Sequence, residues 1–367
     1  MIRLSKSSIS KEEKKAVMDV LDKGYLGMGQ EVEIFEDALS IFFGRPAVCV
    51  SSGTSALHLA CQGIGLVKGD EVLVQSLTYV ASFQAISATG ATPIACDIDL
   101  DTLTIDLDDA KKRVTSKTKA IMPIHFGGGV GDLDSIYNFA DSYGLRVIED
   151  AAHAFGSFYK DKRVGAFGDI ACFSFDGIKN ITSGEGGCIV SDDKELLDRI
   201  RDARLLGVVK DTEKRFQNNR SWEFDVSLQG WRCHMSNIMA AIGIEQLKKF
   251  PRMAKKRQML AKKYDSLLSD NQYVDLLENN FDEIVPHIYV VKCNDRSSGR
   301  DSIRKSLISK KIQTGVHYQP NHLLSLYKNF SSPLVKVENV FPKLLTLPLH
   351  VDLTEENIEF ICNSIQG

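Results

Sequence analysis

The sequence predicts an α/β fold with two domains, and three observations support this prediction. Short apolar runs alternate with helical patterns over residues 1–250. Strands that alternate with helices favour right-handed crossovers and a mainly parallel sheet covered on both faces. A chain of 367 residues is long enough for a large core and a second domain. With 43% hydrophobic and 25% charged residues, the composition is that of an ordinary globular protein.

The first expected element is a helix with both ends marked. Ser10 and Glu13 have the spacing of a capping box, and Gly24 is suited to end the helix. A strand over 47–50 and a helix over 55–66 follow. Further strands are expected at 71–75, 92–97, 120–126, 146–149, 169–175 and 188–191, with helices between several of them, for example 133–143.

A domain boundary is expected near Pro251. A long helix should start near Ser236, and Pro251 should interrupt or redirect it. After it come a charged helix, fewer strands and a last helix capped by Thr354. We therefore predict a large α/β domain with an N-terminal arm over residues 1–250, and a smaller α+β domain over 251–367.

The bulk properties exclude several classes of protein. A formal net charge of −3 creates no broad field for nucleic acid or anionic lipid. The eight cysteines contain no C-x-x-C pair and lie mostly in apolar patterns, which indicates buried free thiols in a reducing compartment and no zinc site. The N-terminus lacks the apolar core of a signal peptide, and no apolar run approaches the roughly 18 residues of a membrane span. We expect a cytoplasmic protein without a metal.

Lys179 is the first candidate for chemistry. It follows the buried strand pattern of 169–175 and precedes the glycine-rich turn of 184–187. A lysine at the end of a buried strand acts as a nucleophilic amine if its charge is disfavoured there. The alternative is a solvated loop lysine, and the buried strand and glycine turn on either side make free solvation less expected.

Asp150 and His153 form the second candidate group. Asp150 ends the strand of 146–149, at the edge where open α/β sheets place their ligands. A buried carboxylate there needs a cation, which a pyridinium nitrogen would supply, unless Asp150 merely caps a following helix. His153 lies three residues on and would share its face of a helical turn. It could bond a phenolic oxygen of a cofactor or be a histidine bonded within the core.

Gly53, Thr54 and Ser55 form a third candidate site, since they follow a strand and open a helix. Backbone amides and the helix dipole converge there on a phosphate, or the segment is a simple N-cap. Ser174 could add a hydroxyl, and Tyr79 could stack on a flat ring or simply pack. Neither a Rossmann fingerprint nor a P-loop is present. An amine, a carboxylate and a phosphate cradle are together the groups that hold pyridoxal phosphate.

With these segments the chain resembles the DegT/DnrJ/EryC1/StrS family of sugar aminotransferases nearly end to end. Several motifs in fixed order carry the resemblance: Gly27-x-Gly29, 50–59, 124–128, 149–156, 173–187, 230–237 with 240–243, 316–318 with Pro320 and His322, and 347–350.

The resemblance implies a fold-type I, aspartate-aminotransferase-like subunit that works as a homodimer with shared active sites. It also implies pyridoxal 5'-phosphate as cofactor, in the pyridoxamine phosphate form during part of the turnover. By position, Lys179 would carry the cofactor, Asp150 would pair with the ring nitrogen and Tyr79 would stack on the ring. The positions implied around the phosphate are Gly53, Thr54, Ser55 and Ser174, and those implied for substrate contacts, where packing is the alternative, are His317, Tyr318 and His322.

Two positions depart from the family pattern. Arg232 stands where members often carry an asparagine that reaches the phosphate of the neighbouring subunit. A cation could do the same more strongly, or meet the pyrophosphate of a sugar nucleotide. His234 stands where arginine is usual. The roles of both residues stay open.

The resemblance implies transfer of the amino group of L-glutamate to a nucleotide-linked keto-6-deoxysugar for polysaccharide or glycan biosynthesis. His153 stands where many members carry glutamine and some carry histidine. The histidine form is similar to the members that aminate C4 of a 4-keto-sugar, which favours a substrate such as dTDP-4-keto-6-deoxyglucose. The alternatives are amination at C3, or a non-catalytic regulatory or scaffold member of the fold. Dehydratases of the family carry histidine at the lysine position, so Lys179 counts against that activity.

Overall fold

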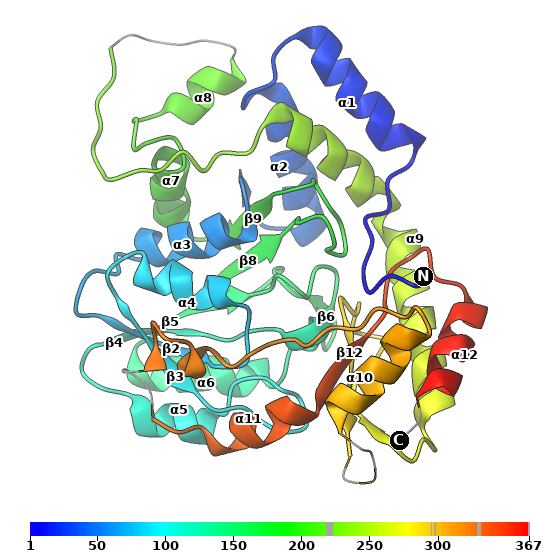
Figure 1. The fold of residues 1–367 in the computed structure, drawn as a ribbon. Helices are drawn as coiled ribbons and strands as arrows, with labels where there is room; N and C mark the ends of the chain where they lie inside the picture. The colour runs from blue at the N-terminus through cyan, green and yellow to red at the C-terminus, as the bar shows by residue number, and fades with distance from the viewer. Residues whose placement is uncertain (218–222, 295, 297–298, 329–331, 366–367) are drawn as a thin grey trace.

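The structure is a computed structural model. It describes residues 1–367 except 218–222, 295, 297–298, 329–331 and 366–367. A seven-stranded sheet forms its centre, in the order β1-β9-β8-β5-β4-β2-β3 (Figure 1). Only β9 runs antiparallel to its neighbours, so the predicted mainly parallel sheet is confirmed. The strands are β1 (Ala47–Val50), β2 (Glu71–Gln75), β3 (Thr92–Cys96), β4 (Thr118–Met122), β5 (Arg146–Asp150), β8 (Ile170–Ser174) and β9 (Gly187–Ser191).

Helices pack on both faces of this sheet because its strands are apolar on both sides. In β8, Ile170 and Cys172 belong to one hydrophobic cluster, and Ala171 and Phe173 belong to another. The first cluster is shared with α3 (Gly53–Gly63), α4 (Val80–Ser87) and α7 (Lys194–Ala203). The second is shared with α2 (Gln30–Phe43), α5 (Leu107–Arg113), α6 (Leu133–Tyr143) and part of α9 (Asn237–Leu268). The short helix α8 (Asp211–Phe216) follows α7.

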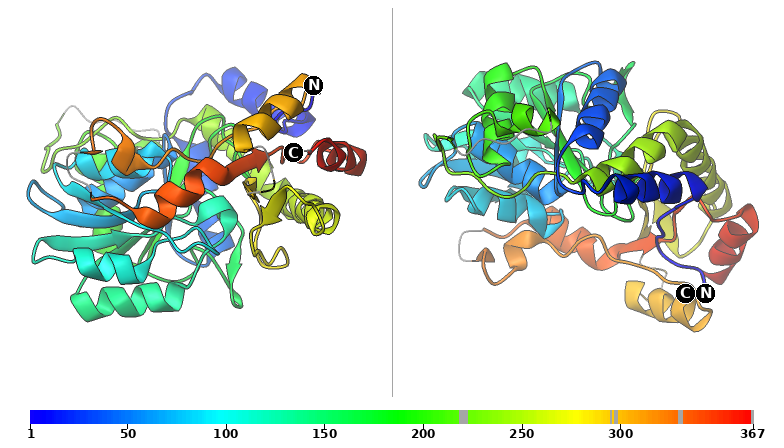
Figure 2. Two further views of the ribbon diagram at one scale, coloured as in Figure 1. Left: turned by 60° about the horizontal axis from the view of Figure 1, so that its bottom comes forward. Right: turned by 90° about the horizontal axis from the view of Figure 1, so that it is seen from above.

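The first helix, α1 (Lys11–Lys23), has the predicted ends. Ser10 and Glu13 form the capping box, and Gly24 adopts a left-handed φ of 70°. Figure 2 shows α1 beside α9, against which it packs. The residues before α1 contact the C-terminal part of the chain, where the Leu349 N–H donates to the Leu4 carbonyl oxygen.

The expected interruption at Pro251 is wrong, because α9 continues through it as one helix of 32 residues. A proline inside a helix costs about 3 kcal/mol, since it removes a hydrogen bond and crowds the preceding turn. Buried side chains on both sides of it, Phe250 and Met253, pack against the sheet and offset this cost.

A second, three-stranded antiparallel sheet follows α9. It consists of β10 (Val274–Leu276), β11 (Tyr289–Cys293) and β12 (Leu344–Leu347), and a third hydrophobic cluster joins it to the end of α9, α10 (Arg300–Ser309) and α12 (Glu355–Ser364). Thr354 caps α12 as predicted. Since α9 belongs to both parts, a domain boundary near Pro251 stays a prediction. The remaining elements are the hairpin β6 (Phe158–Tyr159) and β7 (Lys162–Arg163), the helix α11 (Val335–Val340), and the 3-10 turns Phe126–Gly128, Asn321–Leu323 and Phe341–Lys343.

The structure of the described residues bears on the expectations for cysteines, membrane spans and metal sites. All eight cysteines are free, and all but Cys233 are buried. Within the described ranges, no helix has both the length and the apolar character to cross a membrane. The same part of the chain contains no cluster of three or more His, Cys, Asp or Glu side chains suited to a metal ion.

Candidate active site

A cavity of about 450 Å³ lies where the carboxyl ends of β5 and β8 meet the amino ends of α3 and α4. Most residues predicted for the site line it together, although they come from segments far apart in the sequence: Gly53, Thr54, Tyr79, Asp150, His153, Ser174, Lys179, His317 and Tyr318. Three other predicted residues, Ser55, Arg232 and His322, do not line it.

Lys179 lies on the loop after β8 with its side chain at the cavity. Its backbone N–H donates to the Asp176 carbonyl oxygen at 3.1 Å, and its Nζ lies 3.5 Å from Nε2 of His287. Burial lowers the pKa of Lys179 to about 8, although the charges of Asp150 and Asp176 act in the opposite direction. The uncharged amine is therefore far more populated near neutral pH than in an ordinary lysine, although the charged form still predominates at pH 7.

Asp150 is a buried carboxylate held by uncharged donors. It is 6% exposed. One oxygen accepts from Oγ of Ser82 at 2.7 Å and the other from the N–H of Ala152 at 3.2 Å. Burial raises the pKa of Asp150, while these hydrogen bonds and the charge of Lys179 lower it. Residues 151–157 form turns instead of a helix, so Asp150 is not a helix cap.

His153 lies in these turns, so the expected helical turn is wrong, but its ring still reaches the cavity. Its Nδ1 accepts the N–H of Gly127 at 3.3 Å. The proton of the neutral ring then lies on Nε2, which donates to Oη of Tyr318 at 3.0 Å. Burial, and then the charge of Lys179, lower the pKa of His153 well below its ordinary value. His153 is thus a neutral donor.

The amino end of α3 faces the cavity at a very close contact with β8. A Cβ added to Gly53 would lie 2.7 Å from Cβ of Ser174, so only glycine permits this approach. Ser52 is the N-cap and accepts the N–H of Ser55 at 3.0 Å. The Ser55 hydroxyl lies within hydrogen-bond distance of the Ser51 and Ser52 hydroxyls. Its predicted contact with a phosphate stays a prediction.

Tyr79 and His317 stand on the cavity wall near Tyr318. Tyr79 is 60% exposed, and the centroid of its ring lies 5.7 Å from that of Tyr318. Nδ1 of His317 lies 2.8 Å from Oγ1 of Thr346 in β12. Burial and the charge of Lys179 lower the pKa of His317 to about 4. Both rings line the cavity, and the lowered pKa keeps His317 uncharged at neutral pH.

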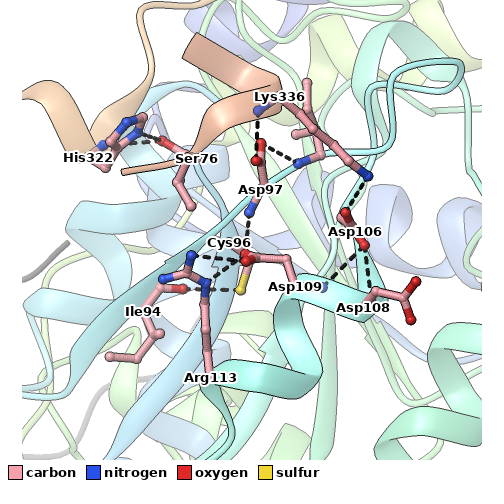
Figure 3. Close-up of polar contacts among 12 residues, drawn as sticks. Ser76, Ile94, Cys96, Asp97, Asp106, Asp108, Asp109, Arg113, His322 and Lys336 are labelled. Atoms are coloured by element: carbon pink, nitrogen blue, oxygen red, sulfur yellow. Dashed lines mark hydrogen bonds and ion pairs between the residues drawn. The ribbon is translucent and has the colours of Figure 1, made fainter. Parts of the chain in front are cut away.

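His322 lies behind the cavity wall and holds two segments together. Its Nδ1 lies 2.7 Å from Oγ of Ser76, and its Nε2 lies 3.1 Å from Glu338. Figure 3 shows the His322 ring beside Ser76. The same view shows Lys336, whose backbone N–H donates to the carboxylate of Asp97 at 2.9 Å. Because His322 is 4% exposed and both ring nitrogens have partners, its position favours a structural role over the predicted substrate contact.

Arg232 lies on the exposed surface, away from this chain's own cavity. It forms an isolated β-bridge with Leu205. His234 lies two residues after Arg232. Burial, and then the charges of Arg215 and Arg232, lower the pKa of His234 to about 4. The structure of this chain alone assigns no ligand contact to either residue.

Two residues beside the candidate amine and carboxylate were not predicted from the sequence. Ser82 bonds Asp150, and its only local signal is its position three residues after Tyr79 in the same segment. His287 lines the cavity and contacts Lys179, yet it precedes β11, in a segment without a motif. No local pattern connects either residue with its partner.

Comparison with known proteins identifies the family. The model of the DegT/DnrJ/EryC1/StrS aminotransferase family matches residues 7–366. The chain belongs to this family. It is 35% identical to the spore coat polysaccharide biosynthesis protein SpsC of Bacillus subtilis, over 98% of this chain and 94% of that protein. The family resemblance and the aspartate-aminotransferase-like fold are therefore confirmed.

Two solved structures of similar proteins support the same conclusion. One is a protein of Streptococcus pneumoniae assigned as a sugar aminotransferase, solved in the PMP form. It is 30% identical to this chain with a TM-score of 0.92, and the match covers 100% of this chain and 98% of that chain. The other is PseC of Helicobacter pylori, an aminotransferase involved in the biosynthesis of pseudoaminic acid, with 29% identity, a TM-score of 0.92, and 99% and 98% covered. The present chain is a pyridoxal phosphate-dependent sugar aminotransferase.

The residues present fit this cofactor. The buried carboxylate of Asp150 has only uncharged hydrogen-bond donors, so a pyridinium nitrogen would supply the missing cation. Gly53 opens α3 without a Cβ at the edge of the cavity, which leaves room for a phosphate at the helix amino end. Lys179 provides an amine whose charge is disfavoured.

Proposed function

We propose that the protein transfers the amino group of L-glutamate to a nucleotide-linked keto-6-deoxysugar at C4, in the biosynthesis of a polysaccharide or glycan. The observation that carries this proposal is the meeting of Lys179, Asp150 and Gly53 in one cavity, with His153 and Tyr318 on its wall. The relatives in spore coat polysaccharide and pseudoaminic acid biosynthesis support a sugar product of this kind.

The chain's own residues would hold the cofactor at three points. Asp150 would bind the ring nitrogen, Tyr79 would cover the ring, and the amino end of α3 with Ser174 would bind the phosphate. Bound pyridoxal phosphate supplies the carbonyl group that accepts the amino group and a ring that withdraws electrons from the reacting carbon.

In this proposal Lys179 moves the protons of both half-reactions. In its uncharged form its Nζ would take the proton from the α-carbon of the amino donor and pass it on to the bound cofactor. In the second half-reaction the same Nζ would return a proton from the cofactor to the sugar carbon that accepts the nitrogen. A pKa of about 8 suits these transfers, because the amine changes its protonation state near the working pH.

His153 supports amination at C4 in this proposal. Its Nε2 donates to Oη of Tyr318, so the Tyr318 hydroxyl hydrogen is left to donate to an oxygen of the bound sugar. Neither residue carries a charge, which suits a neutral deoxysugar ring. The C3-keto-sugar stays the second candidate, since a donor at this position could serve either carbon.

We further propose that two copies of the chain share each active site. Exposed apolar side chains lie on the segment that carries Arg232 (Phe224, Val226 and Trp231) and on the segment that forms a β-bridge with it (Leu206). Such a cluster favours burial by a second copy, which would bring Arg232 toward the neighbouring cavity and its phosphate group. A mixture of inactive K179M and R232E subunits should regain activity through mixed dimers with one intact site. Each variant alone should stay inactive, and no recovery in the mixture would contradict shared sites.

The substrate is tested with the pyridoxamine phosphate form of the protein, prepared with L-glutamate. Keto-sugar nucleotides are added one at a time, and return of the absorbance of the aldehyde-form cofactor reports amino transfer. We expect dTDP-4-keto-6-deoxyglucose to react, and 3-keto isomers to react at least about 100-fold more slowly. Reaction of a 3-keto sugar alone would replace the C4 proposal by the C3 alternative. No reaction with any keto sugar would overturn both.

A further inference from the structure

His287 is a histidine at the active-site cavity for which the proposed function has no role. It stands two residues before β11, and its backbone N–H donates to the Gly127 carbonyl oxygen at 2.9 Å. Its ring packs against that of His153, with 4.5 Å between the ring centroids. Nε2 of His287 lies 3.5 Å from Nζ of Lys179. The side chain is 3% exposed, so solvent does not compete for this contact.

We propose that His287 is a positioning residue that favours the uncharged form of the free Lys179 amine and holds that form at the edge of the cavity. This inference rests on the proposed role of Lys179 and assigns that residue a partner. A distance of 3.5 Å is at the outer limit of a hydrogen bond. The contact is therefore weak enough for the lysine to leave it and turn into the cavity.

The two ring nitrogens of His287 differ in their surroundings. Nδ1 is buried and, within the described part of the chain, has no hydrogen-bond partner. If Nε2 accepted a hydrogen from a charged lysine, the ring proton would have to sit on Nδ1 as an unpaired buried donor, which is unfavourable. With the proton on Nε2, His287 instead donates to the lone pair of the uncharged amine, and Nδ1 is left as an unpaired acceptor, which folded proteins tolerate more readily than an unpaired donor. The pair thus favours the uncharged form of Lys179.

The surroundings of the ring keep His287 neutral. Burial, and then the charge of Lys179, lower the pKa of His287 well below its ordinary value, and the charge of Arg257 acts in the same direction. Arg257 lies in α9, is 3% exposed, and donates to the carbonyl oxygens of His287 at 3.2 Å and Pro286 at 3.4 Å. A buried guanidinium therefore both fixes the main chain at His287 and disfavours a second charge beside it.

The other titratable groups around Lys179 do not replace His287. Asp150 and Asp176 favour the charged amine. Burial, and then the charge of Lys179, lower the pKa values of His153 and His317. His153 uses its ring nitrogens for Gly127 and Tyr318, and His317 directs Nδ1 to Thr346. Among the described histidines beside the amine, only His287 directs a nitrogen at Nζ.

The test measures the protonation of Lys179 in the full chain without cofactor, a form in which a similar protein has been solved. Trace labelling with acetic anhydride from pH 6 to pH 10, read by peptide mass spectrometry, gives the pH midpoint at which Lys179 becomes reactive. We expect a midpoint near 8 for the wild type. In H287Q the amide can turn its oxygen to a charged amine, so the midpoint should rise by about one unit. Labelling at pH 7 should then be about tenfold slower.

The matched control is H350Q, which replaces another buried histidine that makes no contact with Lys179 and should leave the midpoint unchanged. H287N is the second variant if H287Q does not fold. Equal midpoints for the wild type and the His287 variants, or a wild-type midpoint near the ordinary lysine pKa of 10.5, would overturn the proposal. Failure of amino transfer to every keto sugar would contradict the proposed function, but it would not change the pH midpoints at which Lys179 becomes reactive.

Discussion

Replacing Lys179 by methionine removes a charge from a poorly solvated position and keeps a side chain of similar length. Burial lowers the pKa of Lys179 from its ordinary 10.5 to about 8. At about 1.4 kcal/mol per unit, this shift corresponds to ~3 kcal/mol by which the charged form destabilises the folded chain. Solvent still reaches part of the side chain, which reduces the effect. We expect cofactor-free K179M to be more stable than the wild type by about 1–3 kcal/mol at pH 7.

The sign of the pH dependence follows from proton binding. Between about pH 8 and pH 10.5, the unfolded chain holds more protons at position 179 than the folded chain does. The wild type therefore gains stability as the pH rises through this window, and K179M lacks this gain. The stability difference between the two proteins should be largest at pH 7 and should shrink toward pH 10.

Urea unfolding of both cofactor-free proteins at pH 7, 8, 9 and 10, followed by circular dichroism, measures this difference. K68M, which replaces an exposed lysine, serves as the control and should show no comparable gain. A K179M protein no more stable than the wild type at pH 7, or a stability difference that is the same at every pH, would refute a destabilising charge at position 179.

Three further substitutions test the other parts of the site. G53A adds a Cβ at 2.7 Å from Cβ of Ser174, so urea unfolding should show a loss of about 1–3 kcal/mol, and titration should show weaker binding of pyridoxal phosphate. D150N removes the charge that would pair with the ring nitrogen, so the rate of the glutamate half-reaction should fall by about 100-fold or more. H322A breaks the contacts with Ser76 and Glu338 and should cost about 1–3 kcal/mol of stability. In H322A we expect a higher KM for the sugar nucleotide and an unchanged half-reaction with glutamate.

Each of these expectations has an outcome that contradicts it. Wild-type cofactor affinity in G53A would show that the amino end of α3 does not bind the phosphate. A half-reaction rate in D150N within a few-fold of the wild type would remove Asp150 from its proposed role. In H322A, a drop in kcat for the sugar half-reaction with unchanged stability would favour direct contact with the substrate over a structural role.

Strand ends and turns were predictable because their signals are local. Asp150 and Lys179 each follow a short apolar run, and in a parallel sheet the carboxyl ends of such strands lie at one edge. The capping box at Ser10 and the cap at Thr354 are likewise formed by residues three positions apart. Local rules failed at Pro251, because the packing of α9 along two sheets outweighs the unfavourable effect of one proline.

The amino-acid pattern alone was sufficient for the α/β class, the order of the strands along the chain and the edge of the sheet that carries the site, since hydrophobic periodicity and turn residues act over a few positions. Only the folded chain decided which distant side chains meet there. It places His287 against Lys179 and Ser82 against Asp150. It also places His322 against Ser76, outside the lining of the active-site cavity. These contacts join residues separated by 68 to 246 positions, and they depend on how helices and sheets pack, which no short window of sequence encodes.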